Sequence, residues 1–527
     1  MAKSLTQNRQ LLWRLPLAGI GGAISTLAYP RFDFWPAIFI SVIALLVSIR
    51  DLNLWRSLLV GFVGGFFFYF AQITWMSQYL GPAPLLALSG LEAIIFAIGM
   101  AAIAKTTAWL DGFALDGFIP SAWRPLQISL AVATLWTARE WVAINMPYGG
   151  FPWSRLAMSQ ADSVLGKWVY YGGQPLLSFL IAFISALALT SSIQARKSGL
   201  AKPATAIAIT ATALVFAIPA ATVLPTTPQA GSYVIAAVQG NANAGLFANP
   251  VAGSILQNHL DATKLIAKSE LAKSVNVVVW PENASDINPL ADIAVGQQIR
   301  TLVDKQLHVP LIFGTLTERG DQIYNSSILW KPGIGATDWY DKKRPVPFAE
   351  YVPDRSFWYS LAPDLIGLIS RGFSFGTRDG IFDIGKTHLG VLICFEIAID
   401  DISRDLVNQG AQVIISQTNN SDFGHSDETY QQVAIAKLRA IETGRAVVND
   451  STVGVSAVFA PDGTVLAKLP TFKPGVMVTR VPLRTDITPA LRIEPAFNLL
   501  TIIMGLALMI LSGTWVRFRR KKTQEQV

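Results

Sequence analysis

One cysteine stands in this chain of 527 residues, Cys394, within the sequence GVLICFEIAID at 390–400. The apolar run before it predicts a strand, and the residues after it predict a helix. A thiol at such a strand-to-helix turn projects above the sheet near helix N-terminal amides, which favour the thiolate. Cysteine is also among the most buried residue types, so Cys394 taken alone is more typical of a structural residue than of a nucleophile.

A cysteine nucleophile needs a base, and histidine is the usual one. The chain has four histidines, His259, His308, His388 and His425. His388 lies six residues before the cysteine on the same predicted strand, so about 20 Å separates the two at ~3.3 Å per residue. His425, in a different loop, remains open as a base. Four scattered histidines with one cysteine argue against a zinc site, and we predict neither a metal nor a cofactor.

Glu282 is another candidate base, since it follows the apolar run VVVWP and should stand at a strand end. A carboxyl group beside apolar strands and a Trp-Pro pair loses solvation, and the pKa of a glutamate then rises toward the range of a general base. Glutamates at strand ends are often merely solvated, so Glu282 alone is weak evidence.

A third segment, YDKKRPVPFAEYVP at 340–353, holds two lysines and a glutamate in a proline-rich, irregular stretch. A fixed ammonium there could stabilise an oxyanion or a thiolate. Paired basic residues in loops are otherwise usually solvated, which is the plainer interpretation of this segment by itself.

The elements that would position these residues are short β-branched runs alternating with helical stretches. Strands are predicted at 233–241, 275–283, 309–317, 325–332, 387–396, 411–419 and within 446–469, and helices at about 251–273, 398–409 and 428–443. Strands that are apolar on both faces and joined by helical crossovers indicate an α/β sandwich with buried sheets.

The rest of the chain is predicted to be a membrane domain. Hydrophobic residues make up 51% of the sequence and charged residues 15%, and the mean hydropathy is +0.40. A helix needs roughly 20 apolar residues to cross a hydrocarbon slab about 30 Å thick. Eight such spans are predicted, at about 12–30, 34–49, 54–78, 84–110, 126–146, 174–194, 203–223 and 495–516. The first could instead be a cleaved signal peptide, but the spans that follow it favour a retained helix.

Basic residues set an orientation for these spans. They cluster before the first span, between the second and third, between the sixth and seventh, and after the eighth. Positive charge in short loops stays in the cytoplasm, so eight crossings place all four clusters inside and residues 224–494 outside. Arg155 and Lys167, in the loop after the fifth span, do not fit this pattern.

The net charge of +7 does not indicate a nucleic-acid partner. The basic cluster VRFRRKK directly follows the last span, where anionic lipid headgroups are the simpler partner. An outward-facing domain would not meet nucleic acid, and the sequence has no aromatic-basic motif of that kind.

The segments VVVWPEN, YDKKRPVPFAEYVP and GVLICFE, in this order, resemble the Glu-Lys-Cys set of the nitrilase, or carbon-nitrogen hydrolase, superfamily. An outward domain of this kind before the last of eight spans is similar to the apolipoprotein N-acyltransferase family. That family's membrane half is matched by YPRFDFWPAIFI (29–40), LWTAREWV (135–142) and GGFPWSRLAMSQ (149–160).

The resemblance implies an α-helical membrane domain of about eight transmembrane helices plus a nitrilase-like α-β-β-α sandwich domain. The expected domains are a seven-helix transmembrane domain at 1–224 and an extracytoplasmic catalytic domain at 225–490. A final transmembrane helix and a basic cytoplasmic tail would follow at 491–527.

Carried over by motif, the resemblance implies that Glu282 is the general base, Cys394 the nucleophile and Lys342 the lysine that stabilises the oxyanion. Lys342 is preferred to Lys343 because the family spacing is Tyr-x-Lys, and Tyr340 sets that register.

Supporting roles are implied for three further residues. Glu350 and Glu396 match acidic positions of the family's site and would orient the lysine, the cysteine or an incoming amine. Phe395 stands beside the nucleophile, where the family commonly has a tyrosine.

The chain departs from the family pattern elsewhere too. Arg344-Pro345 replaces a common His-Leu pair, Asp422 stands where a tryptophan is usual, and Phe247 is the aromatic residue nearest to a tryptophan expected after the VQGN strand. Loss of hydroxyl and indole groups could alter acyl-chain or lipoprotein preference while leaving the triad intact.

The function implied is transfer of a fatty acyl chain from a phospholipid to the N-terminal α-amine of the diacylglyceryl-cysteine of apolipoproteins. The path would be ping-pong, through a thioester on Cys394. The partners implied are a phospholipid acyl donor, a diacylglyceryl-modified apolipoprotein acceptor and membrane lipids. The place implied is the bacterial cytoplasmic membrane, which the chain crosses several times, with the catalytic domain on the extracytoplasmic face.

Three other interpretations stay open. The same triad could serve a membrane-tethered amidase or nitrilase with water as acceptor. The departures from the family pattern suit a catalytically silent membrane scaffold. A transporter would use the intramembrane Arg139-Glu140 pair, but it would leave the triad unexplained.

The segment RSFWYSLAPDLIGLISRGFSFG at 355–376 lies between the lysine and cysteine motifs and is rich in aromatic and aliphatic residues. It is either an insertion that packs on the core or an amphipathic arm. As an arm it would dip toward the bilayer, admit acyl chains and limit the water that reaches a thioester.

Overall fold

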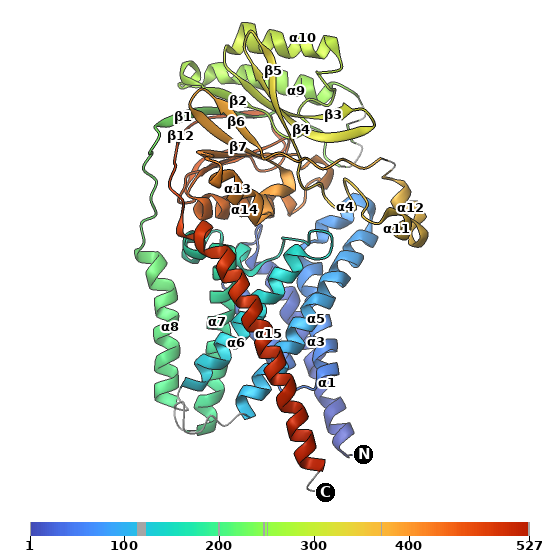
Figure 1. Cartoon of the computed structure of the whole chain (residues 1–527), viewed down its shortest axis with the longest axis vertical. Coiled ribbons are helices and arrows are strands. Elements are labelled where there is room, and N and C mark those ends of the chain that lie inside the picture. The colour runs from blue at the N-terminus through green and yellow to red at the C-terminus, as the bar shows by residue number, and fades with distance from the viewer. Residues whose placement is uncertain are drawn as a thin grey trace. The chain divides into compact units, whose positions relative to one another are not determined.

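The computed structural model describes residues 2–112, 123–198, 201–245, 248–249, 251–369 and 371–524 (Figure 1). The chain divides into two compact units. A helical unit comprises Met1–Ser77, Pro82–Val223 and Pro489–Val527. An α/β unit comprises Gln78–Gly81 and Leu224–Thr488.

Each of the eight predicted spans coincides with a helix of the helical unit. These helices are α1 (Ala2–Ile24), α2 (Ala37–Ile49), α3 (Leu54–Gln72), α5 (Pro82–Gly112), α6 (Arg124–Asn145), α7 (Val169–Ser198), α8 (Ala201–Ala221) and α15 (Pro489–Gln524). A one-turn helix, α4 (Ser77–Leu80), follows α3.

Five stretches in the described part of the chain are long and apolar enough to cross a membrane by length and composition. They are Leu11–Ala28, Leu54–Gln72, Pro82–Gly112, Val164–Arg196 and Pro489–Thr514. The apolar stretches Ala37–Ile49 in α2 and Thr205–Ala221 in α8 are shorter. The α6 helix carries Arg139 and Glu140 on its buried face.

These two charged side chains of α6 have partners inside the helical unit. Arg139 donates from Nη1 to the hydroxyl of Tyr69 at 3.1 Å, and its guanidinium lies over the ring of Phe96, 4.6 Å from the centroid. Glu140 accepts the backbone N–H of Leu156 at 3.0 Å. Charged residues in membrane helices are tolerated where they face such partners. The presence of Arg139 and Glu140 in α6 is therefore compatible with a helix that spans the membrane.

Glycines allow α1, α3 and α5 to approach closely. A Cβ on Gly22 would lie 2.3 Å from the carbonyl oxygen of Gly64, and one on Gly65 would lie 2.6 Å from Cβ of Phe96. Small residues at such contacts are a common means of packing membrane helices.

The α/β unit contains two six-stranded sheets. The first has the order β12-β1-β2-β3-β4-β5, with β1 (Ser232–Gln239), β2 (Val277–Val279), β3 (Leu311–Arg319), β4 (Gln322–Lys331), β5 (Gly335–Asp341) and β12 (Gly475–Pro482). The second has the order β11-β10-β9-β8-β7-β6, with β6 (Ile381–Ile384), β7 (Thr387–Ile393), β8 (Val413–Thr418), β9 (Ala446–Ser451), β10 (Ala457–Phe459) and β11 (Val465–Lys468).

Helices cover the outer faces of both sheets (Figure 1). They are α9 (Ser254–Thr263) and α10 (Ile293–Leu302) on the first sheet, and α13 (Asp400–Asn408) and α14 (Glu428–Thr443) on the second. The short helices α11 (Arg355–Leu361) and α12 (Pro363–Gly367) belong to the segment between the lysine and cysteine motifs. The fold is therefore the expected nitrilase-like α/β sandwich.

Apolar side chains fill the layers on both sides of the first sheet. Ile235 and Val279 pack with Val391 and Ile415 of the second sheet, and the alternate residues of the first sheet pack against α9 and α10. Strands buried on both faces account for the continuous apolar runs in the sequence.

The strands β5, β6 and β12 have no counterpart among the predicted strands, and all three lie at sheet edges. An edge strand has one unpaired side and mixed polarity, so its sequence gives a weak apolar pattern. The helix predicted at 251–273 is observed only as α9, which ends at Thr263. Short 3-10 turns follow it.

Candidate active site

Cys394 begins a 3-10 turn, η9 (Cys394–Ala398), directly after β7. The predicted strand 387–396 therefore ends at Ile393. The φ of Cys394 is +55°, in the left-handed region that non-glycine residues rarely adopt. Such a conformation costs about 1–3 kcal/mol and persists only where the surroundings hold it, which is common at functional sites.

Glu282 follows β2 and the Trp280-Pro281 pair, and it is 5% exposed. One carboxylate oxygen accepts the Nδ2 of Asn325 at 2.7 Å, and the other accepts the backbone N–H of Asn419 at 2.9 Å. These two donors hold the carboxyl group in one orientation at the end of the strand.

Lys342 follows β5 and is 1% exposed. Its Nζ lies 2.9 Å from Oε1 of Glu350 and 3.5 Å from Oε1 of Glu282. The neighbouring Lys343 instead places its Nζ 2.5 Å from Oδ1 of Asp379. Lys342 is thus the lysine of the pair that faces Glu282.

The predicted supporting residue Glu350 is joined to the same cluster. Its Oε2 accepts the backbone N–H of Val346 at 2.6 Å, and its Oε1 lies 3.2 Å from Nδ2 of Asn325. Asn325 therefore connects both carboxylates. The sequence did not single out this residue, because Asn325 stands beside Ser326 and Ser327 in β4, although a buried asparagine needs a partner.

Glu396 is fully buried and ties the lysine loop to the cysteine turn. It accepts the backbone N–H groups of Lys343 at 2.7 Å and Arg344 at 3.1 Å, and that of Ile393 at 2.9 Å. The hydroxyl of Tyr340 also donates to it at 2.9 Å. Because it spans the residues beside Lys342 and Cys394, Glu396 fixes the position of one relative to the other.

The electrostatics of the cluster suit proton transfer. Burial raises the pKa of Glu282 against the attraction of Lys342, and burial followed by the charge of Glu282 raises the pKa of the Cys394 thiol. Burial disfavours the Lys342 ammonium, but Glu350 and Glu282 outweigh this effect, and its pKa lies above the ordinary value. The site thus combines a thiol, a poised carboxyl group and a permanent cation.

A second polar group borders the sulfur of Cys394 and was not predicted. Gln432 of α14 places its Nε2 3.6 Å from the sulfur. Asn420 donates to Gln432 and to Glu428, and burial raises the pKa of Glu428 to about 8. The helix 428–443 was predicted, but nothing in its pattern indicated which residues face the cysteine.

The remaining candidates lie apart from this chemistry. His425 is exposed with its ring against Phe472, the centroids 3.8 Å apart, and His388 pairs with Asp383 at 2.6 Å. Within the described residues, no histidine hydrogen-bonds to Cys394. Phe395 is half-buried.

Two of the departures from the family pattern also have a place in the structure. Arg344 lies 3.4 Å from Asp401, Nη2 to Oδ2, and burial raises the pKa of Asp422. Phe247 lies outside the described residues.

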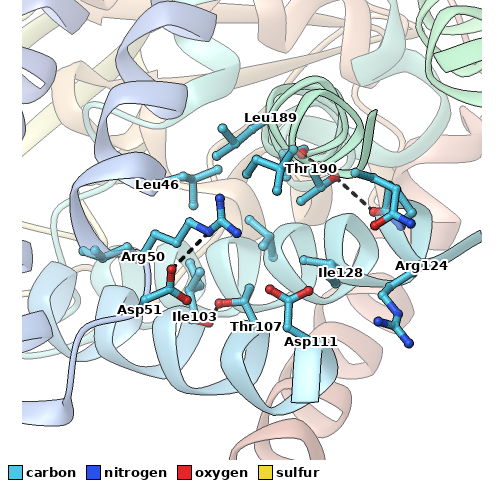
Figure 2. A pocket seen from close by; sticks show the side chains of 16 residues that line it. Leu46, Arg50, Asp51, Ile103, Thr107, Asp111, Arg124, Ile128, Leu189 and Thr190 are labelled. Atoms are coloured by element: carbon cyan, nitrogen blue, oxygen red, sulfur yellow. Dashed lines mark hydrogen bonds and ion pairs between the residues drawn. The ribbon is translucent and has the colours of Figure 1, made fainter. Parts of the chain in front are cut away.

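A pocket lies within the helical unit (Figure 2). It has a volume of about 60 Å³ and is lined by residues of α2, α5, α6 and α7, with Asp111 and Arg124 among them, and by Arg50 and Asp51 just after α2. Arg50 lies 3.5 Å from Asp51, Nε to Oδ2. No predicted site residue lines it.

Known proteins resemble both parts of the chain. Residues 21–187 match the family described as apolipoprotein N-acyltransferase N-terminal domain, and residues 234–486 match the carbon-nitrogen hydrolase family. An apolipoprotein N-acyltransferase of Mycolicibacterium smegmatis is 31% identical, with 94% of this chain and 84% of that protein covered. One from Pseudomonas syringae pv. tomato is 28% identical, with 94% and 96% covered.

The comparison with solved structures matches about half of the chain. An amidase of the nitrilase superfamily from Nesterenkonia AN1 covers 52% of this chain and 97% of its own, with 18% identity and a TM-score of 0.38.

Proposed function

The chain belongs to the apolipoprotein N-acyltransferase family, and from this premise we propose that it transfers a fatty acyl chain from a phospholipid to the α-amine of a diacylglyceryl-modified N-terminal cysteine. The observation that carries the proposal is the convergence of Glu282, Lys342 and Cys394. These residues come from three distant motifs, yet Nζ of Lys342 lies 3.5 Å from Oε1 of Glu282, and the charges of Glu282 and Lys342 both act on the pKa of the Cys394 thiol.

In the proposed first step, the Glu282 carboxylate takes the proton of the Cys394 thiol. The sulfur attacks the carbonyl carbon of a phospholipid ester, and the charge that develops on the carbonyl oxygen is stabilised by the Lys342 ammonium. The C–O bond then breaks, Glu282 returns the proton to the leaving alkoxide, and a lysophospholipid departs. An acyl thioester remains on Cys394.

In the proposed second step, the α-amine of the lipoprotein attacks the thioester carbonyl. Glu282 takes the proton that the amine loses, the carbon–sulfur bond breaks, and the products are an amide and free Cys394. The Cys394 thiolate regains its proton from Glu282. The same carboxyl group therefore serves both halves of a ping-pong cycle.

We place the protein in the bacterial cytoplasmic membrane with the α/β unit on the extracytoplasmic face. The support is the distribution of basic residues, which puts all four positive clusters on one side if there are eight crossings. Both substrates carry lipid anchors, so a catalytic unit at the membrane surface would meet each of them without extracting it from the bilayer.

The arm formed by α11 and α12 is proposed to receive acyl chains. Phe357, Tyr359 and Leu361 are 55%, 49% and 63% exposed, whereas Ile366 is buried. Arg355, at the start of α11, donates to the carbonyl of Ile369 at 2.5 Å and so links the two ends of the arm. Exposed aromatic and aliphatic side chains on short helices suit insertion into a lipid surface. Deletion of 357–372 that left acyl transfer unchanged in a folded protein would contradict this role.

The proposed function is tested by incubating the purified protein with phospholipid and measuring its intact mass. We expect an increase by one acyl group on wild-type protein and none on Cys394→Ala. Addition of a diacylglyceryl peptide should then yield N-acylated peptide and lysophospholipid in equal amounts. Release of free fatty acid in place of N-acyl peptide would favour the hydrolase, and absence of both adduct and products would favour the silent scaffold.

A further inference from the structure

Asn420, Glu428 and Gln432 form a buried polar group next to Cys394. Neither step of the proposed acyl transfer uses it. Glu428 and Gln432 are four residues apart on α14, so they lie on the same face of the helix. They are 3% and 1% exposed. The Nε2 of Gln432 lies 3.6 Å from the sulfur of Cys394, with the amide as donor.

The contacts of Asn420 determine which end of the Gln432 amide faces the sulfur. The hydroxyls of Thr418 and Ser451 donate to Oδ1 of Asn420 at 3.2 and 2.5 Å. Asn420 therefore uses Nδ2 as its donor, to Oε1 of Gln432 at 2.8 Å and to Oε2 of Glu428 at 2.7 Å. With its oxygen occupied in this way, Gln432 must turn its NH₂ group toward the sulfur.

The helix that carries Gln432 is fixed to the cysteine turn. Arg439, seven residues further along α14, donates from Nε to the carbonyl of Ile397 at 3.2 Å and from Nη2 to Oδ1 of Asp400 at 2.9 Å. Seven residues are about two helical turns, so Arg439 and Gln432 lie on one face. The distance between Gln432 and the sulfur is thus set by the docking of the whole helix.

We propose that Gln432 is a further catalytic residue, whose side-chain N–H hydrogen-bonds to the Cys394 sulfur, and that Asn420 and Glu428 are positioning residues that hold its amide in that orientation. The inference rests on the proposed role of Cys394 as nucleophile. Burial and the charge of Glu282 raise the pKa of the thiol, and a hydrogen bond to the sulfur favours the thiolate. The same bond stabilises sulfur as the leaving group when the amine attacks.

Alkylation with iodoacetamide tests the proposal, because Cys394 is the only thiol in the chain. Gln432→Met keeps nearly the same shape and removes the donor. We expect the apparent pKa of the thiol to rise, and alkylation at a fixed pH below that pKa to slow about three- to tenfold, the range of one hydrogen bond. Gln431→Met is the matched control, since Gln431 is the preceding residue of α14 and is 2% exposed; it should stay within about twofold of wild type.

The positioning part is tested at Glu428. Glu428→Gln keeps an oxygen that can accept from Asn420, and its alkylation rate should not fall below about half that of wild type. Glu428→Leu removes the acceptor and should slow alkylation as Gln432→Met does. Since both act through one amide, the double variant Glu428→Leu/Gln432→Met should be no slower than Gln432→Met alone.

A thiol pKa and alkylation rate unchanged in folded Gln432→Met would overturn the catalytic part. Multiplying effects in the double variant would overturn the positioning part. If Gln432→Met failed to fold, Gln432→Glu would replace it, because an oxygen facing the sulfur should slow alkylation at least as much. Alkylation needs no lipid, so these results are independent of whether wild-type protein forms an acyl adduct.

Discussion

At the scale of single residues, the site separates two lysines that are adjacent in sequence. Lys342 is buried between Glu350 and Glu282, whereas the side chain of Lys343 is 25% exposed and pairs with Asp379. A cation fixed in a site that excludes water can stabilise an oxyanion far better than a solvated one. The roles of the two residues can therefore be tested by the same substitution.

Lys342→Met should lower the rate of acyl-adduct formation about 10²- to 10³-fold, the usual cost of losing one oxyanion-stabilising group. Lys343→Met is the matched control and should change the rate by less than about threefold, the effect of a partly exposed ion pair. The measurement is intact-mass spectrometry over time with phospholipid. Equal losses in the two variants would assign the pair a structural role.

Glu428 predicts how stability depends on pH. Burial raises its pKa from the ordinary 4.5 to about 8, so between these values the folded protein keeps a proton that the unfolded chain has lost. Stability from this group is fully present below pH 4.5 and is lost as the pH rises through 8. Glu428→Gln should therefore show a smaller drop in thermal midpoint between pH 5.5 and 8.5 than wild type.

The control for that measurement is Glu270→Gln, which changes an exposed glutamate of the same unit. It should show the same drop as wild type. A drop in Glu428→Gln as large as in wild type would mean that other groups dominate the titration.

At the scale of elements, the site is assembled where the parallel strands of each sheet end. β1, β2 and β3 are parallel, as are β7, β8 and β9. The carboxyl ends of parallel strands lie on the same side of a sheet. The residues that follow β2, β7 and β8 therefore come together there. They include Glu282, Cys394 and Asn420. Lys342 joins them from β5, which pairs antiparallel with β4 and so runs in the direction of β3.

The backbone of Glu282 depends on a glycine in the next strand. A Cβ on Gly314 would lie 2.6 Å from Cα of Glu282 and from the backbone nitrogen of Asn283, and 2.7 Å from the carbonyl oxygen of Pro281. Gly314→Ala must push this backbone aside. A displacement of about 1 Å should lower the rate of adduct formation about 100-fold.

Gly90→Ala is the control for this prediction, since a Cβ there would have nothing within 4 Å. It should leave the rate within about twofold of wild type. A Gly314→Ala protein that folds and reacts at the wild-type rate would show that Glu282 tolerates the shift and would count against its proposed role as base.

At the scale of the whole molecule, the proposed orientation can be tested with single cysteines in a Cys394→Ala background. Ser274→Cys lies on the exposed surface of the α/β unit, and Ser198→Cys lies between the sixth and seventh predicted spans. With intact cells and a membrane-impermeant maleimide, we expect labelling at position 274 and not at 198. Disruption of the cells should make both reactive. The reverse pattern would place the α/β unit in the cytoplasm.

The arm is also tested at this scale. Simultaneous change of Phe357, Tyr359 and Leu361 to serine removes exposed apolar area without touching the triad. We expect slower acyl-adduct formation from phospholipid vesicles, about tenfold or more if the arm admits the acyl chain, with unchanged alkylation of Cys394 by iodoacetamide. A loss in both assays would indicate that the substitutions disturb the site itself.

The class of fold and the candidate catalytic groups could be predicted from the sequence. Long apolar runs require helices that bury their backbone groups, and strands apolar on both faces require helical covers. The order of the Glu, Lys and Cys motifs indicated the family, and the eight predicted spans coincide with eight helices. These features are local, so each can be seen along the chain before any folding is considered.

Which residues share a site depends on how distant segments pack together. Asn325 is 43 residues from Glu282, and Gln432 is 38 residues from Cys394. Asn420 reaches the site through Gln432, and no periodic pattern marks these three residues. The edge strands β5, β6 and β12 gave a weak signal because part of their side chains is exposed, which breaks the continuous apolar run of a buried strand. The role of a buried amide side chain depends on its hydrogen-bond partners. Only folding brings those partners together from distant parts of the chain.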